Sequence, residues 1–191
     1  MASTLKVQNI AHTGGTTGLT VASTGIVTAS KEVINTDYMI DQWRLTSNYA
    51  TNDSVITANW ERTDDASFGR IGTGISESSG IFTFPTTGVY LITVNARVQV
   101  QASDGTAGFE LKVSTDSGNS SDTVATAYEG NTGSGDINTS TSASILVNVT
   151  NASNFQFFIK TASIEGAASH VAGHTSENQT MITFERKGPS Q

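Results

Sequence analysis

The chain has 191 residues, no cysteine and a formal net charge of −7, with only 10 lysine and arginine residues. This composition excludes disulfides, cysteine-based metal sites and cysteine nucleophiles, and the scattered basic residues form no stripe for binding nucleic acid. No apolar run reaches the roughly 18 residues of a membrane span, and the first six residues lack the apolar stretch of a secretory signal. We therefore expect a soluble protein that neither binds nucleic acid nor inserts into a membrane.

Residues 1–35 differ in pattern from the rest of the chain. Short alternating runs at 5–10, 19–21 and 26–28 are separated by glycine-containing turns. Strands this short cannot bury themselves in a monomer, so we interpret the segment as an extended N-terminal β arm, covered by copies of itself around a three-fold axis or by a larger particle. A flexible Gly/Thr-rich arm is the alternative. The residues expected to anchor the arm are Leu5, Val7, Ile10, Leu19, Val21, Ile26 and Val27.

Residues 36–188 are predicted to form one all-β domain. Short runs of alternating apolar and polar residues recur at regular spacing, and no helical periodicity interrupts them. The pattern is clearest in residues 89–101, where every second residue from Val94 to Val100 is apolar. About ten antiparallel strands of this kind predict a β-sandwich or a jelly roll. The expected strands are 39–46, 55–62, 68–72, 81–84, 89–101, 108–113, 123–128, 143–149, 155–160 and 180–186.

The segment Gly-Ile-Phe-Thr-Phe-Pro-Thr-Thr-Gly-Val-Tyr at residues 80–90 predicts a strand, a tight turn and a long strand. Its order also resembles the second-to-third strand region of the globular head of complement component one q, a jelly roll related to tumour necrosis factor. Asn-Phe-Gln-Phe at 154–157 and Thr-Phe-Glu-Arg at 183–186 resemble the last two strands of that head. The resemblance covers residues 37–187 and implies a trimer that presents binding loops and is no enzyme.

The resemblance extends to heads of this kind in marine tailed-phage proteins. The Trp43 strand, Glu-Arg at 61–62 and Ile-Gly-Thr-Gly at 71–74 are similar to those heads. The arm is similar to the N-terminal segments of phage fibre and virion proteins, which attach a head to the particle. The Gly-x-y stalk of the animal proteins is absent from the sequence, which separates this chain from the animal-type function but leaves the fold in place.

The aromatic residues of the predicted strands can be interpreted as a ligand stripe or as a core. Alternation favours the core, because residues two apart in a strand share one face; 82 with 84 and 155 with 157 are such pairs. Together with one turn glycine, the residues expected to build the core are Trp43, Phe82, Phe84, Gly88, Tyr90, Phe155, Phe157 and Phe184.

Residues with possible site chemistry are few and scattered. His170 and His174 have a spacing that holds zinc on a helix, but Gly173 and the small polar residues around them predict a water-exposed loop. Loop carboxylates can bind calcium, yet the Asp-x-Asp-x-Asp ladder of a calcium loop is missing. We expect no catalytic residue, no metal and no cofactor. The candidate ligand-binding residues lie in loops 116–122, 130–140 and 165–179 and are Asp116, Asp122, Asp136, His170 and His174.

The leading hypothesis is a homotrimeric bacteriophage virion protein on the particle surface, made in the host cytoplasm. It would be a tail-fibre-type adhesin whose arm contacts other virion proteins and whose head loops bind a host glycan or protein. The main alternative is a capsid decoration protein, whose arm laces onto the shell. A polysaccharide depolymerase and a secreted ligand of the tumour necrosis factor type are more distant alternatives.

Overall fold

The computed structural model describes residues 9–11, 17–21, 23–24, 27–29 and 38–191. The chain divides into two units, and the boundary in the sequence lies between Thr36 and Asp37. In the first unit, β1 (Asn9–Ala11), β2 (Thr17–Val21) and β3 (Val27–Ala29) form an antiparallel sheet in the order β1-β2-β3. Of the predicted anchor residues, Ile10, Leu19, Val21 and Val27 lie in these strands, and Leu5, Val7 and Ile26 lie outside the described residues.

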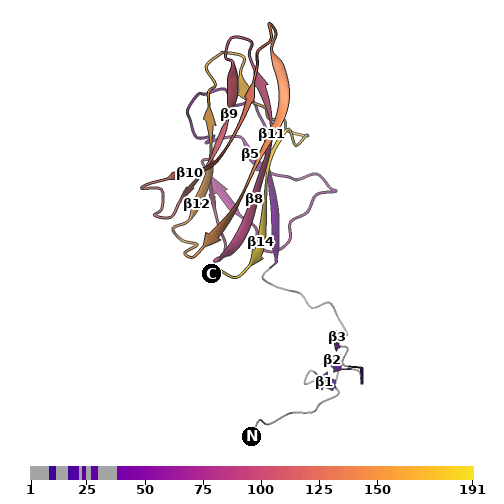
Figure 1. Cartoon of the computed structure of the whole chain (residues 1–191). Helices are drawn as coiled ribbons and strands as arrows, with labels where there is room; N and C mark the ends of the chain where they lie inside the picture. Colours follow the sequence, from indigo (N-terminus) through magenta and orange to yellow (C-terminus); the bar gives the residue numbers. More distant parts are fainter. Residues whose placement is uncertain (1–8, 12–16, 22, 25–26, 30–37) are drawn as a thin grey trace. The chain divides into compact units, whose positions relative to one another are not determined.

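The second unit consists of two antiparallel sheets packed as a sandwich (Figure 1). One sheet has the order β10-β9-β12-β7-β6 and contains β6 (Ser76–Ser78), β7 (Ile81–Thr83), β9 (Thr106–Ser114), β10 (Asp122–Gly130) and β12 (Gln156–Ala162). The other has the order β11-β8-β14-β4-β5, with β13 paired to β8, and contains β4 (Met39–Leu45), β5 (Trp60–Arg62), β8 (Gly88–Val100), β11 (Ile137–Val149), β13 (His170–Val171) and β14 (Thr180–Gly188). The predicted all-β jelly roll is confirmed. The described part of the chain contains no helix that could cross a membrane.

Alternation along β8 determines which side chains enter the core. Tyr90, Ile92, Val94, Ala96 and Val98 are buried, and the residues between them face the other side of the sheet. β8 pairs with β11 over thirteen residues without a register shift. A slip of one residue would turn all of these apolar side chains toward water, so burial of one face specifies the register.

An aromatic cluster joins the two sheets. Phe82 is fully buried, and its ring centroid lies 5.8 Å from that of Trp43, 5.5 Å from that of Phe184 and 6.1 Å from that of Phe157. Phe84, Tyr90 and Phe155 extend the cluster through edge-to-face contacts. The seven aromatic side chains assigned to the core from the sequence are between 0% and 8% exposed.

Gly88 occupies a corner between the sheets. The residues before it belong to β7 in one sheet, and β8 begins at Gly88 in the other, so the Pro-Thr-Thr-Gly turn is no hairpin. A Cβ on Gly88 would lie 2.5 Å from Nε of Arg186. Both Nε and Nη2 of Arg186 donate to the carbonyl of Thr87, and the Tyr90 hydroxyl donates to the carbonyl of Thr86. These bonds satisfy the carbonyls that a turn between sheets leaves without ladder partners.

The predicted strand 55–62 is wrong in its extent. Only Trp60–Arg62 pairs with β4, whereas Ile56 donates its N–H to the carbonyl of Ile159 in the opposite sheet. The chain crosses between the sheets at Asn59, whose φ is +67°. Residues 68–72 also form no strand, and Ile71 alone pairs with Ile40. An alternating apolar run has the same sequence pattern whether its residues pair within one sheet or are divided between two.

Candidate functional site

The loops lie at two ends of the sandwich. At the apical end, drawn at the top of Figure 1, lie loops 101–105, 131–136 and 163–169; at the basal end lie loops 84–87, 115–121 and 150–155 and the C-terminus. Met39, where β4 begins, pairs with Arg186 at the basal end, so the covalent connection to the arm is made there. The apical loops are therefore the ones farthest along the strands from the attachment of the arm.

The predicted ligand-binding residues do not form one site. Asp136 lies in an apical loop and His170 lies in β13 beside β8, at the same end. Asp116 lies in a basal loop and Asp122 at the start of β10. His174 is placed beside the end of β4, because its N–H donates to the carbonyl of Leu45.

The Asp116 carboxylate binds its own loop. It accepts hydrogen bonds from the Ser120 hydroxyl at 2.7 Å, the Ser120 N–H at 2.9 Å and the Ser114 hydroxyl at 2.8 Å. These donors lower the pKa of Asp116 to about 2, and the Ser120 hydroxyl has the largest effect. Within the described ranges, no group of three or more His, Asp or Glu side chains is arranged to hold a metal ion. Asp116 thus has a local structural role in the loop.

The low pKa of Asp116 predicts a pH-dependent contribution to stability. The group titrates near 3.8 when unfolded and near 2 when folded, so its contribution is complete above the unfolded pKa and is lost as the pH falls toward 2. We expect Asp116→Asn to be less stable than the parent at about pH 6, and the difference to shrink by about pH 2. Urea midpoints at the two pH values measure this. A difference that stays constant would show that the carboxylate charge is not involved.

Asn131 cross-links the apical loops. It is 5% exposed, and its side-chain amide donates to the carbonyls of Val100 and Gly135, both at 2.9 Å, while its Oδ1 accepts the N–H of Gly133. The N–H of Asn131 donates to the carbonyl of Gly105 at 2.7 Å. One side chain therefore fixes loop 131–136 against the β8–β9 turn.

The neighbouring loop 163–169 is held by a second set of bonds. The fully buried Ser169 accepts the N–H of Gln101 at 2.8 Å, and Gln101 Oε1 accepts the N–H of Ala168 at 3.0 Å. Burial raises the pKa of Asp104, but hydrogen bonds from Ser169 and from the Gly166 backbone outweigh it, and the pKa is lowered overall. Loops fixed before binding lose little conformational freedom when a ligand arrives, so the apical end is suited to present a binding surface.

The two histidines have separate environments. Nδ1 of His170 lies 2.8 Å from the carbonyl of Ala168, which can only accept, so this nitrogen is the donor. Nδ1 of His174 accepts the N–H of Ser176 at 3.1 Å. His170 is half-buried in a strand rather than in the expected loop, and His174 is exposed.

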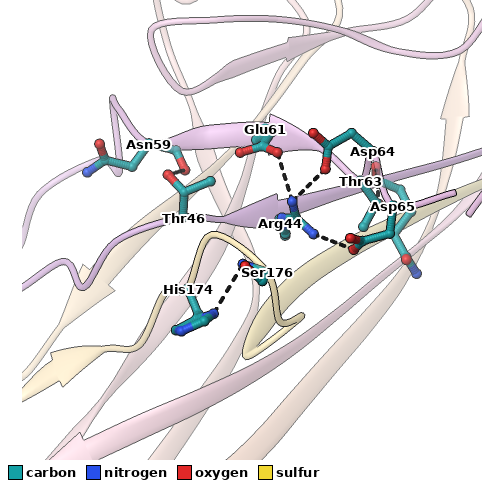
Figure 2. A network of polar contacts seen from close by, with 10 residues as sticks. Arg44, Thr46, Asn59, Glu61, Thr63, Asp64, Asp65, His174 and Ser176 are labelled. Carbon is teal, nitrogen blue, oxygen red and sulfur yellow. Dashed lines mark hydrogen bonds and ion pairs between the residues drawn. The ribbon is translucent and has the colours of Figure 1, made fainter.

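Sequence reasoning missed a charged network around Arg44. This side chain is 2% exposed, and it binds Glu61 at 2.8 Å, Asp64 at 2.6 Å and Asp65 at 2.9 Å (Figure 2). Burial lowers the pKa of Arg44, but its bonds to Asp65 and Glu61 outweigh this effect and raise it overall. The network ties the turn after β5 to β4. The network depends on the strand register that places Arg44 opposite Glu61, and the sequence alone does not show that register.

The outward face of β11, in the six-stranded sheet, carries no charge. The outward residues of β11 from 138 to 148 are Asn, Ser, Ser, Ser, Leu and Asn, and none is charged. Leu146 is 67% exposed and lies opposite Leu91 of β8, and the next outward pair is joined by a hydrogen bond from Ser144 to Thr93. We name the outward residues of β11 from 138 to 148, together with Leu91 and Thr93 of β8, the hydroxyl face. Leu146 has the largest exposed fraction among the large hydrophobic residues that the structure describes.

The comparisons with known proteins show the fold. No protein-family model and no curated protein sequence matches the chain. The crystal structure of murine APRIL at pH 5.0 has a TM-score of 0.58 at 13% identity and covers 78% of this chain and 98% of its own. Eiger TNF from S. frugiperda has a TM-score of 0.55 at 12% identity, and the match covers 81% of this chain and 95% of the Eiger chain. At these identities, the likeness establishes a jelly roll like that of tumour necrosis factor and nothing finer.

Proposed function

We propose that the protein is a homotrimeric, non-enzymatic binding head. The observation that carries the proposal is the hydroxyl face, with Leu146 exposed to water in the single chain. Three copies that cover this face would bury the leucine pair, and the small serine and threonine side chains would let the sheets approach closely. The likeness to the jelly roll of tumour necrosis factor supports the proposal, because domains of that kind generally form homotrimers.

In this proposal, the apical loops bind the ligand. They lie at the end of the sandwich opposite Met39, where the arm joins, and Asn131 and Gln101 hold them rigid. A trimer presents three such surfaces in one direction. Several weak contacts of this kind raise the overall affinity by orders of magnitude, because each later contact forms within one assembly.

We further propose that the head belongs to the surface of a tailed-phage virion, as a tail-fibre-type adhesin. The three-stranded sheet of β1, β2 and β3 supports an attachment role, since strands of three to five residues need a partner surface to be stable. A capsid decoration protein would use the same arm on the shell. Labelled antibodies imaged on intact virions distinguish tail from capsid, and particles without label would refute both. Shortening of a polysaccharide by the purified protein would instead favour the depolymerase.

A charge on the hydroxyl face tests the trimer. We expect Leu146→Glu to convert the protein to monomers at micromolar concentration, because three buried carboxylates would repel one another and lose their hydration. Light scattering measures the mass against that of the parent. Val124→Glu is the matched control, since Val124 is 41% exposed on β10 of the other sheet. A parent protein that is already monomeric, or a trimer that tolerates Leu146→Glu, would overturn the proposal.

A further inference from the structure

A hollow of about 430 Å³ lies beside the edge of the six-stranded sheet. It forms because the chain turns away from β4 after Thr63 and returns at Ile71, which pairs with Ile40. Its volume is in the range of about 300–1,000 Å³ that is usual for small-molecule sites. None of the predicted ligand-binding residues contributes to it. The residues that line it are Asp41, Gln42, Arg62, Thr63, Phe68, Gly69 and Arg70.

Asp41 and Arg62 form the inner wall of the hollow. Asp41 is fully buried; its Oδ1 accepts from Nε of Arg62 at 2.9 Å and its Oδ2 from Nη2 at 3.0 Å. Oδ2 also accepts the N–H of Ile75 at 2.7 Å and the indole N–H of Trp43 at 3.3 Å. The carboxylate is therefore saturated with donors. The Arg62 side chain is 34% exposed, and its Nη1 takes part in none of these bonds.

Arg70 supplies an uncompensated positive charge. It makes no hydrogen bond or ion pair with the residues that the structure describes, whereas Arg62 is neutralised by Asp41. Its stem is held in place by Gly74, where an added Cβ would lie 2.5 Å from Cδ of Arg70 and 2.7 Å from Oδ2 of Asp41. The φ of Gly74 is +79°, which side chains rarely allow. The lining thus carries one net positive charge in a chain of −7.

The carboxylates of β5 and of the turn after it make no direct contact with Arg70. Glu61, Asp64 and Asp65 are bound to Arg44, and Figure 2 shows their side chains directed at its guanidinium. Phe68 lies two residues before Arg70, and its N–H donates to the carbonyl of Asp65 at 2.8 Å. Phe68 is 46% exposed, so an aromatic side chain and a guanidinium that binds none of the described residues border the same hollow.

We propose that this hollow binds the carboxylate-bearing ring of an acidic sugar, such as a uronic acid. Arg70 pairs with the carboxylate through its fork of N–H groups, and Nη1 of Arg62 adds a further donor. The ring of Phe68 packs against the C–H face of the sugar, and the Thr63 hydroxyl oxygen accepts from a sugar hydroxyl. The proposal names a ligand class for the binding head, and it rests on the proposed function only for the gain in avidity.

An acidic sugar explains the hollow better than an acidic peptide does. A carboxylate alone needs only the guanidinium groups, and it would leave most of the 430 Å³ and the exposed ring without a role. A pyranose ring fills that space and places an apolar C–H face on the aromatic ring. The contacts of one such ring predict weak binding, with a dissociation constant on the order of millimolar.

The test compares two sugars that differ only at the carboxylate. Methyl β-D-glucuronide and methyl β-D-glucoside are titrated into the full chain at low salt, and NMR chemical-shift changes are followed. We expect the glucuronide to bind at least tenfold more tightly than the glucoside. Arg70→Gln should weaken glucuronide binding at least tenfold. Lys112→Gln is the control, because Lys112 lies on the other sheet, and it should change binding less than twofold.

Phe68→Ala distinguishes the contribution of the sugar ring to binding from that of the carboxylate. We expect this variant to weaken the glucuronide several-fold but to leave the response to acetate unchanged. Equal binding of the two sugars, or an equal loss with Lys112→Gln, would overturn the proposal. If an N-acetylglutamate amide binds as tightly as the glucuronide, the ligand class is an acidic peptide and not an acidic sugar, and the proposal is overturned. Light scattering on the same samples shows whether the trimer is intact, so failure of the sugar site and failure of the trimer are distinguishable.

Discussion

Asp41→Ala is expected to lower the free energy of unfolding by about 3–5 kcal/mol, because it leaves a partly buried guanidinium without its partner. The carboxylate accepts from Arg62, from the indole of Trp43 and from the N–H of Ile75. It therefore ties β4, β5 and the segment before β6 together at one point. Urea unfolding at a single protein concentration measures the loss, since the stability of an oligomer depends on concentration.

Two further variants isolate the Asp41 effect. Asp122→Ala removes an exposed carboxylate at the start of β10, and it should change stability by less than about 0.5 kcal/mol. Arg62→Gln combined with Asp41→Ala should cost less than the sum of the single changes, because the two residues act as a pair. Strict additivity of the two changes would contradict the role given to the ion pair.

Phe82→Ala should cost about 3–5 kcal/mol, because truncating a buried ring removes its burial and leaves a cavity. Phe82 is fully buried, and its ring contacts those of Trp43, Trp60, Phe157 and Phe184. These neighbours come from both sheets, so the cavity cannot close by moving one strand. The expected effect lies toward the upper end of the range.

The matched control for Phe82 is Phe68→Ala. Phe68 is 46% exposed in the loop after β5, and its truncation should change stability by less than about 0.5 kcal/mol. The two variants remove the same ring atoms, so the difference between them measures burial. Similar urea midpoints for both would show that the aromatic cluster is not the centre of the core.

Much of the sandwich could be predicted from local pattern. In β8, the alternation from Val94 to Val100 indicated which face is buried, and the structure confirms it. Pairing across sheets could not be predicted in the same way. Residues 55–56 bond to one sheet and 60–62 to the other, although the sequence reads as a single run. The switch at Asn59 depends on which neighbouring strand is near, which no local pattern encodes.

The candidate sites were predicted less well, and particular residues show why. Asp116 and Asp136 were grouped as loop carboxylates, but they lie at opposite ends of the sandwich. No site was predicted at Arg70 or Gly74, because an exposed arginine and a loop glycine are common, and Gly74 was noted only as part of the segment 71–74. They became a candidate site only where the fold places the arginine stem against the glycine, beside Asp41.

The sequence by itself determined the fold class, the buried face of each long strand and the aromatic core, because these follow from alternation between neighbouring residues and from the cost of exposing apolar surface. It also determined that no cysteine chemistry is possible. The tertiary structure alone decided which strands share a sheet, which carboxylate meets which guanidinium, and where a hollow remains. Those features depend on distances between residues far apart in the chain, such as Arg44 with Asp65 and Asp41 with Ile75, and such distances are set only when the strands have paired and the turns between them have folded.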